Sequence, residues 1–421
     1  MASEALIPSS KPAAHRDVVP PHTAAPDIPA SFVFAPSPAR LLASAALLLA
    51  IAGLAYALHV NGQASVSLSI LCGAAFGVVL QRSRFCFFCN FRDWFDDGDP
   101  RGLIGILVAL GVGAVGYAIV FGAWLPDPST GRLPPDAFIG PVSIALVIAG
   151  FAFGAGMAIS GSCVSAHLYR LGEGSPTAPF ALVGTAIGFA AGFLSWNALY
   201  LTFIADAPIV WLPRWLGYAG TLVASLATLA SVALILTRNA RRFPLPVDTD
   251  FWRRLVIHRW PASIGGAIVG VLGMVAYLRV APLGVTAEIG GRTRQAAQAL
   301  GISPARLEGL DTLRGCVTVV RDAVLSNNGA FVLALVVAAF ATAFAAGQFK
   351  PACPVAGQAV RGLIGGMLLG WGAMIGLGCT IGTLLSGIMA GALSGWVFGA
   401  AVFGGVAVTL WAGRRAGLLP A

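Results

Sequence analysis

The sequence predicts an all-α integral membrane protein with about nine to ten transmembrane helices and two related halves. Of its 421 residues, 57% are hydrophobic and only 10% are charged, and the mean hydropathy is +0.83. A soluble domain carries about 25% charged residues, so this chain has too little polar surface to face water. The 53 glycines agree with this class, because small residues let transmembrane helices pack closely.

A repeated pattern of glycines ending in a cysteine predicts the two halves. Residues 148–163 and 364–379 align so that Cys163 matches Cys379. The other matched pairs are Ile148 and Ile364, Gly150 and Gly366, Gly154 and Gly370, Gly156 and Gly372, Ile159 and Ile375, and Leu168 and Leu384. Transporters built from repeats hold their substrate where the repeats meet. We therefore expect each half to bring one cysteine to that place.

Apolar stretches predict the helices in order along the chain. Residues 1–40 are rich in Pro, Ala and Ser and predict a disordered tail. A first membrane half is expected at 41–240, a basic cytoplasmic loop at 241–260 and a second membrane half at 261–421. The apolar stretches are 41–60, 66–80, 102–123, 142–168, 179–203, 215–237, 262–280, 329–347, 362–385 and 389–411. Several approach the ~20 residues that span a bilayer, and the shorter or glycine-interrupted ones predict short re-entrant helices.

Positive charge predicts the orientation in the membrane. Cytoplasmic loops carry an excess of Lys and Arg, so ten spans place both termini in the cytoplasm. The basic positions are Arg238, Arg241, Arg242, Arg253, Arg254 and Arg259 in one loop, and Arg414 and Arg415 after the last span. Residues 282–327 would lie outside although they hold five arginines. This segment is interpreted as a solvated helical pair whose acidic residues offset the charge, or as a basic basin that concentrates anions.

The seven cysteines do not predict a disulfide framework or a metal site. Their number is odd and their settings are scattered and apolar. None of the five histidines has ligand spacing from a cysteine pair, so zinc is not expected. No other cofactor and no nucleic-acid partner are expected. The pattern assigns no role to Cys72, Cys89, Cys316 or Cys353.

The end of the second apolar stretch predicts a charged thiol site. Gln81, Arg82, Arg84 and Cys86 follow one another closely there, and positive charge favours the thiolate of a nearby cysteine. Arginines at a membrane edge, beside a cysteine that fills apolar space, would explain the same residues. Cys86 and Cys89 also form a Cys-x-x-Cys pair, which leaves a membrane thiol-disulfide oxidoreductase as an alternative.

Glycines at every fourth residue predict close helix packing and a helix break beside a cysteine. They are Gly150, Gly154, Gly366, Gly370, Gly378 and Gly382. A helix break leaves backbone N–H groups that can hold an anion. The adjoining Cys163 or Cys379 would suit a soft sulfur atom in the substrate, because thiols are weak hydrogen-bond partners.

These motifs resemble those of the YeeE/YedE family of membrane proteins that import sulfur compounds. They recur in the family's order, and the resemblance runs from about residue 65 to the end of the chain. The matching segments are Leu80–Cys86 with Phe91–Asp93, Gly154–Met157 through Cys163 with Tyr169–Gly174, Pro282–Glu288 with Gly309–Cys316, and Gly378–Gly382 with Leu384–Gly387.

The resemblance implies uptake of thiosulfate across the inner membrane by a helical protein with two inverted, pseudo-symmetric halves. In such proteins short helices dip in from each face of the membrane. The family's cysteines fall on Cys86, Cys163 and Cys379, and they pass the anion inward through successive S–H contacts along a central path. Some members work with a small soluble sulfur-carrier protein of the TusA type, and a related branch is associated with selenium.

We therefore predict a multi-pass transporter of the bacterial inner membrane, and not an enzyme, that carries thiosulfate or a related sulfur oxyanion into the cytoplasm. Its partners are the bilayer, the anion and, by resemblance, a TusA-like carrier. The expected substrate-binding residues are Cys86, Cys163, Cys379, Gln81, Arg82, Arg84, Gly378 and Gly382. A membrane protein that transfers persulfide sulfur through its cysteines and a selenium-compound transporter are the alternatives.

Overall fold

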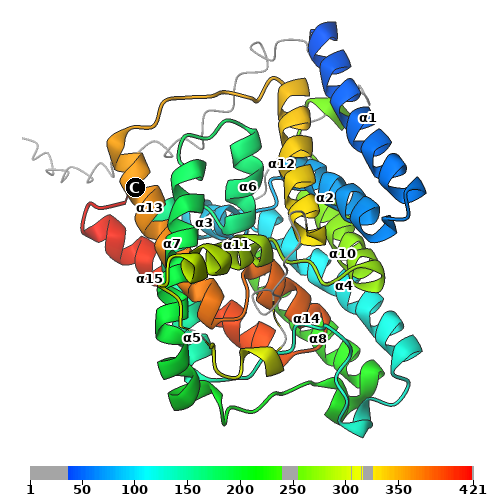
Figure 1. Cartoon of the computed structure of the whole chain (residues 1–421), viewed down its shortest axis with the longest axis vertical. Helices are drawn as coiled ribbons and strands as arrows, with labels where there is room; N and C mark the ends of the chain where they lie inside the picture. Colours follow the sequence, from blue (N-terminus) through cyan, green and yellow to red (C-terminus); the bar gives the residue numbers. More distant parts are fainter. Residues whose placement is uncertain (1–36, 239–254, 305, 314, 316–325, 420–421) are drawn as a thin grey trace, which may run out of the picture.

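The computed structural model describes residues 37–238, 255–304, 306–313, 315 and 326–419, and its elements there are all helices (Figure 1). The only extended pairings in these ranges are isolated bridges from Pro141 to Ile209 and from Trp211 to Ala392. The first half holds α1 (Pro38–Val60), α2 (Ala64–Ser83), α3 (Phe87–Asp97), α4 (Arg101–Trp124), η2 (Pro128–Thr130), α5 (Ile144–Ser160), α6 (Val164–Gly172), α7 (Ala178–Leu199), η3 (Tyr200–Ile204) and α8 (Pro213–Arg238). The second half holds α10 (Ala262–Arg279), α11 (Thr286–Ala299), η4 (Leu310–Thr312), α12 (Asn327–Ala345), α13 (Ala356–Ile375), η5 (Thr380–Ser386), α14 (Gly387–Met389) and α15 (Leu393–Arg415).

Within the described ranges, nine spans are long and apolar enough to cross a membrane. A tenth is formed if α13 is joined to the segment made of η5 and α14, which is bent by 44° from α13. This confirms the predicted nine to ten spans. The predicted short helices are found as the second pieces of broken spans, since α3 follows α2 and α6 follows α5 within one span each. Most of the predicted tail, and residues 241–254 of the predicted basic loop, lie outside the described residues.

Contacts between α5, α7, α13 and α15 show how the two halves are related. Along α5 and α13 the contacts run in opposite directions, because Ala149 lies against Gly372 and Gly156 lies against Gly365. These two helices are therefore antiparallel. Contacts between α7 and α13 run in the same direction, as do those between α5 and α15.

The remaining long helices repeat this arrangement. Ser65 and Asn327 are hydrogen-bonded at the starts of α2 and α12 over 3.4 Å, and Gln81 in the last turn of α2 is hydrogen-bonded to Gln348 just beyond the end of α12 over 2.7 Å. These helices are therefore parallel. Helices α4 and α10 are also parallel in their contacts. Thus α5 of the first half runs beside α15 of the second, and α13 runs beside α7. In the same way α2 runs beside α12, and α10 runs beside α4. A pseudo-two-fold axis in the membrane plane reverses the direction of equivalent helices, so the antiparallel course of α5 and α13 agrees with the predicted inverted halves.

Glycines set the distance between these helices. A Cβ atom at Gly188 would overlap the carbonyl of Met367, and a Cβ at Gly366 would overlap the carbonyl of Ala181. The same holds for Gly154 against Val402 and for Gly370 against Thr185. Helix backbones therefore touch directly, which is the packing that small residues spaced four apart allow. Close packing predicted from the glycine pattern is confirmed at these positions.

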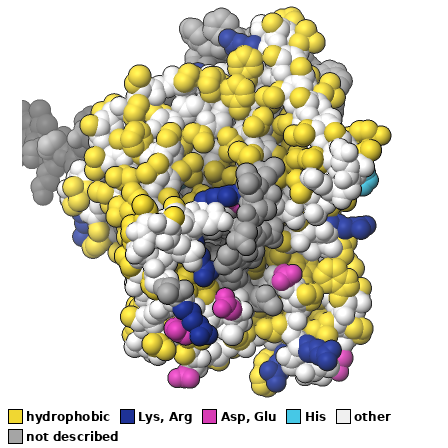
Figure 2. Space-filling model, in the orientation of Figure 1, with side chains coloured by type: hydrophobic (Ala, Val, Ile, Leu, Met, Phe, Trp, Pro, Cys, Tyr) yellow, Lys and Arg dark blue, Asp and Glu magenta, His cyan; other side chains and the backbone are white. Residues whose placement is uncertain are grey.

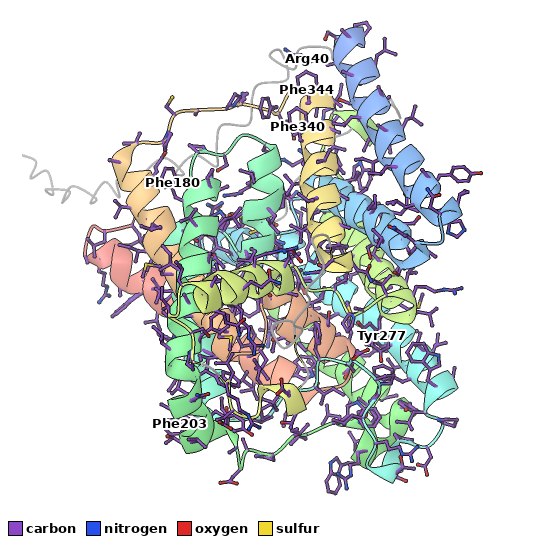
Figure 3. The ribbon with its side chains drawn as sticks, in the orientation of Figure 1. Arg40, Phe180, Phe203, Tyr277, Phe340 and Phe344 are labelled. Atoms are coloured by element: carbon purple, nitrogen blue, oxygen red, sulfur yellow. The ribbon has the colours of Figure 1, made fainter. Side chains whose placement is uncertain are left out.

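The outer helices carry apolar side chains that have no protein partner. Leu49 on α1 and Ile235 on α8 are about 70% exposed, and hydrophobic side chains cover most of the face seen in Figure 2. In water such a surface would be costly, whereas lipid tails accept it. At the start of α1 the Arg40 guanidinium lies 5.9 Å from the centre of the Phe344 ring on α12 (Figure 3).

The arginine-bearing segment 282–327 is buried at its start and more exposed along the rest of its described residues. Its described residues include the helix α11, whose first residue Thr286 is fully buried with the preceding Val285. The Glu288 carboxylate accepts a hydrogen bond from Ser326 at 2.5 Å and pairs with Arg292 at 2.7 Å. These bonds hold the segment against α12, because Ser326 caps that helix. Residues 305, 314 and 316–325 lie outside the described part of the segment.

Candidate functional site

The three predicted cysteines share one backbone arrangement. Each lies two residues after a position in the left-handed region, and each immediately precedes a short helix: α3 after Cys86, α6 after Cys163 and η5 after Cys379. The left-handed positions are Arg84 (φ +49°), Gly161 (φ +82°) and Leu377 (φ +59°). A left-handed residue ends a helix, and the extended cysteine that follows begins a new one.

This arrangement directs free backbone N–H groups at each thiol. The first N–H groups of a helix lack partners within it, and here the cysteine sulfur accepts from them. The N–H of Cys89 donates to the Cys86 sulfur over 3.4 Å. The N–H of Ala166 interacts with Cys163, and those of Ile381 and Gly382 interact with Cys379. A helix N-terminus carries partial positive charge and is a ready site for an anion.

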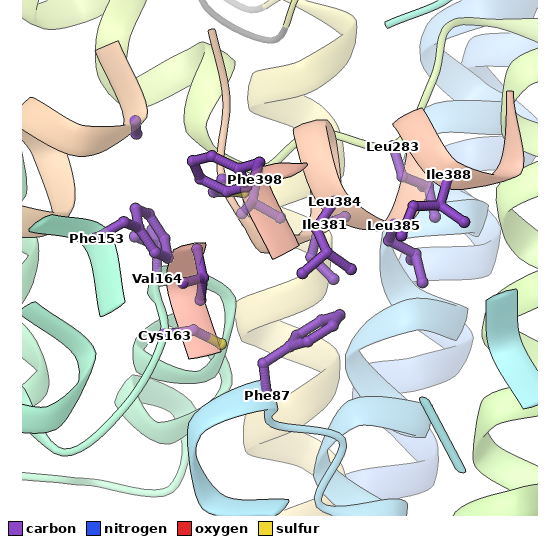
Figure 4. Close-up of a cluster of buried hydrophobic side chains, with 14 of the residues drawn as sticks. Phe87, Phe153, Cys163, Val164, Leu283, Ile381, Leu384, Leu385, Ile388 and Phe398 are labelled. Carbon is purple, nitrogen blue, oxygen red and sulfur yellow. The ribbon is translucent and has the colours of Figure 1, made fainter. Parts of the chain in front are cut away.

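Two of the thiols lie side by side. The sulfur of Cys163 interacts with the Cys86 thiol and with the backbone N–H of Phe87, and it lies 3.2 Å from the Ser165 hydroxyl. Figure 4 shows this sulfur directed towards Phe87. The short helices α3 and α6 therefore meet at their N-termini, although they belong to two different spans.

The third short helix completes the cluster from the other half of the protein. Ile381 and Leu384 of η5 lie in the same apolar group as Phe87 and Val164 (Figure 4). The Cys379 thiol interacts with the hydroxyl of Thr286, which has no other polar partner among the described residues. Cys86, Cys163 and Cys379 are at most 1% exposed. The structure thus encloses all three thiols in an apolar interior, next to helix N-termini.

The predicted polar residues lie at one end of this interior. Gln81 donates from its amide nitrogen to Gln348 over 2.7 Å and to Glu173 over 3.3 Å. Arg82 is 2% exposed and donates to the carbonyl of His258. Its Nε and Nη1 atoms are buried and have no hydrogen-bond partner. Arg84 is exposed, so these two arginines do not contact the thiols.

The guanidinium that reaches the thiols belongs to Arg170, which the sequence pattern did not single out. From α6 it donates to the Cys89 sulfur over 3.3 Å and to the carbonyl of Gly161 over 3.3 Å. Cys89 in turn interacts with Cys86. Three thiols and one guanidinium therefore form a continuous group between α3 and α6. The position of Arg170 inside the motif 169–174 was the available signal.

The two predicted glycines of the second half lie beside Cys379. Gly378 precedes it within the helix break, and the N–H of Gly382 interacts with its thiol. Of the remaining cysteines, Cys72 is buried in α2, Cys353 is exposed, and Cys316 lies outside the described residues. In the described ranges, no three His, Cys, Asp or Glu side chains are grouped so as to hold a metal ion.

Comparisons with known proteins agree with this architecture. The family described as sulphur transport (Sulf_transp) matches residues 82–408. The chain is 28% identical over 353 residues to a protein of Escherichia coli strain K12 named thiosulfate transporter TsuA, covering 78% of this chain and 88% of the relative. It is 29% identical over 339 residues to the thiosulfate transporter TsuA of Spirochaeta thermophila, covering 78% and 93%. The probable transporter YedE of E. coli is 27% identical over 183 residues, which is 43% of each chain. The family match covers well over half of the sequence and every cysteine-bearing helix break, and the chain belongs to the sulphur transport family.

Proposed function

We propose that this protein carries thiosulfate, or a sulfur oxyanion of the same shape, as an intact anion from outside the cell into the cytoplasm. The observation that carries the proposal is the shared arrangement at Cys86, Cys163 and Cys379. At each of them a buried thiol lies against the first backbone N–H groups of a short helix. Two relatives that cover most of the chain are named thiosulfate transporters, which supports the choice of substrate.

The two ends of a thiosulfate ion need different partners. Its three oxygens spread negative charge and are good hydrogen-bond acceptors, which suits the N–H groups at the starts of α3, α6 and η5. Its terminal sulfur is soft and polarisable, and a thiol in an apolar setting is a weak donor of matching character. Holding both ends weakly at each station lets the anion leave again, as conduction requires.

Geometry suggests an order for the stations. Cys379 is followed by the adjacent pair Cys163 and Cys86, and then by Cys89 with Arg170. Beyond them lie Gln81 and Arg82, and the buried Nε and Nη1 atoms of Arg82, which have no hydrogen-bond partner, can donate to an anion. Arg82 thereby takes part in substrate transfer, although it contacts no thiol. Gly378 and Gly382 permit the close approach of the anion to the backbone of η5.

The orientation follows from positive charge. The end that holds Arg82 also holds His258 of the segment before α10, and Arg414, which pairs with Asp96 at 2.5 Å. Basic segments are retained in the cytoplasm, so this end faces inward, with both termini cytoplasmic. The opposite end, with residues 125–143, faces outward. The membrane halves 41–240 and 261–421 then enclose the path between them.

Uptake of labelled thiosulfate by bacteria that lack their other sulfate and thiosulfate importers tests the proposal. Cells that produce this protein are expected to accumulate the label and to grow on thiosulfate as their sulfur source. A cytoplasm-dependent reporter fused after Ala421 is expected to be active in the same cells. No accumulation, with the protein present in the membrane, contradicts the proposed substrate, and selenium compounds are then the next candidates.

Transfer of sulfur alone is the second candidate, because Cys86, Cys89 and Cys163 are close enough for one thiol to hand sulfur to the next. In that case a cysteine thiolate would attack the outer sulfur of thiosulfate, the S–S bond would break with release of sulfite outside the cell, and only the outer sulfur, held as a persulfide, would cross. Mass spectrometry of the protein isolated during turnover separates the two. Bare thiols support transport of the intact anion, whereas an added sulfur on Cys163 or Cys379 supports transfer.

A further inference from the structure

Leu377 occupies a backbone position that disfavours its side chain. Its φ of +59° lies in the left-handed region, where a Cβ atom crowds the following carbonyl and a branched apolar residue is an outlier. The register that aligns Cys379 with Cys163 aligns Leu377 with Gly161, which has φ +82° and no Cβ. Strained residues of this kind persist where the surroundings hold them for a purpose.

The residue Leu377 lines a small pocket at the end of the protein that we propose faces outward. The other lining residues include Phe138, Gly140, Ser143, Thr383 and Ser394. Leu377 lies close to Gly140 in this wall, since its Cδ1 atom is 3.5 Å from the place that a Cβ of residue 140 would take. The pocket has room for about one water molecule, so it is too small for a thiosulfate ion in this state.

The wall of the pocket includes the stretch of chain that leads to Cys379. Ile375, Gly376 and Leu377 of its wall are the residues that lead to Cys379. Thr383, also in the wall, donates its N–H to the carbonyl of Cys379 over 2.8 Å. Leu377 itself is only 6% exposed and Cys379 only 1%. Leu377 is therefore a buried residue of the pocket wall that lies two positions before the buried thiol.

The matching place in the other repeat is open. A Cβ atom at Gly161 would meet no atom within 4 Å, although Gly161 stands in the same relation to Cys163 as Leu377 does to Cys379. Only one of the two inverted breaks is thus closed by a side chain. This difference cannot come from the backbone requirement, because glycine satisfies that requirement better than leucine does.

We propose that the Leu377 side chain is the barrier between this pocket and the Cys379 thiol, and that it controls access of solutes from the outward face to the first station of the path. The barrier's role in uptake rests on the proposed function, whereas its effect on access to Cys379 does not. A branched side chain at this position has to move aside, or rotate, each time an anion passes.

The test measures how fast Cys379 reacts with an anionic thiol reagent, 2-sulfonatoethyl methanethiosulfonate, added to the outward face of the purified full-length protein in lipid vesicles. Modification is followed by mass spectrometry of the peptide that contains Cys379. In Leu377→Ala and Leu377→Gly the reaction is expected to be at least about tenfold faster than in the parental protein. Leu377→Met keeps a long apolar side chain and is the matched control, with a rate close to the parental one.

Two variants keep the test decisive. Leu377→Gly removes the left-handed strain and Leu377→Ala keeps it, so a change seen in both comes from the lost side chain and not from the backbone. Parental rates in both the alanine and glycine variants would overturn the proposal, as would a methionine variant that reacts as fast as the alanine one. Faster reaction without thiosulfate uptake by any of these proteins would leave the barrier standing and contradict the proposed function.

Discussion

Replacing Cys163 by serine is expected to reduce thiosulfate uptake by more than about tenfold, close to the background of cells without the protein. Serine preserves the size of the side chain and its bonds to the Phe87 N–H and the Ser165 hydroxyl, but it removes the soft S–H contact to the terminal sulfur. A loss of about 1.4 kcal/mol at one station is already tenfold. Cys379→Ser is expected to behave in the same way, because Cys379 precedes η5 as Cys163 precedes α6.

Cys353→Ser is the matched control for these variants. Cys353 is exposed, so its replacement is expected to leave uptake at the parental level. Membrane content and thermal stability in detergent are measured for each protein, which separates loss of transport from loss of fold. If well-inserted Cys163→Ser and Cys379→Ser proteins import thiosulfate at the parental rate, the thiols are not stations for the anion.

Replacing Arg170 by alanine is expected to have the second large effect. The guanidinium is the positive group in direct contact with a thiol of the path, through Cys89, and it also holds the Gly161 carbonyl at the end of α5. Truncating a partly buried, hydrogen-bonded charge costs about 2–5 kcal/mol at protein interfaces. A loss of about 3 kcal/mol would lower uptake at limiting thiosulfate about 100-fold.

Arg170→Lys and Arg415→Ala serve as controls for this prediction. Lysine keeps the charge but not the planar fork that reaches two acceptors, so partial recovery is expected, mainly as a lower KM than in the alanine variant. Arg415 lies over the Trp411 ring at 4.2 Å, near the end of α15, and its replacement is expected to leave uptake unchanged. Equal uptake by the Arg170→Ala and parental proteins would contradict a direct role in holding the anion. A lysine variant that recovers the full maximal rate of uptake but not the parental KM would contradict it as well.

The helical fold and two of its key cysteines follow from local features of the sequence. Long apolar stretches predict the spans because a bilayer demands internal hydrogen bonding over a fixed length. The repeat predicts that Cys163 and Cys379 are equivalent, and both indeed begin a short helix after a left-handed residue. That equivalence is visible in sequence because the backbone turn constrains neighbouring residues.

The contacts between short helices do not follow from sequence spacing. Arg170 and Cys89 are hydrogen-bonded although 81 positions separate them, and only the meeting of the N-termini of α3 and α6 brings them together. The exposure of Arg84 was equally hidden, because a residue beside Cys86 in sequence points elsewhere once the backbone turns left-handed there. Sequence proximity to a cysteine was therefore a poor guide to which arginine serves it.

Leu377 shows a further limit of pattern matching. A glycine is the residue expected at a left-handed helix end, and Gly161 fulfils that expectation. The leucine at the matched position reads in sequence as one more apolar residue of a span, and only its φ value and its place in the pocket wall reveal the difference.

Uptake of thiosulfate labelled separately at its inner and outer sulfur, into lipid vesicles that contain only the purified protein, tests the central claim most directly. Passage of the intact anion along the thiols predicts that both labels accumulate at the same rate and to the same level. Accumulation of the outer sulfur alone would contradict the account, because the cysteines would then carry sulfur covalently and the protein would be a sulfurtransferase.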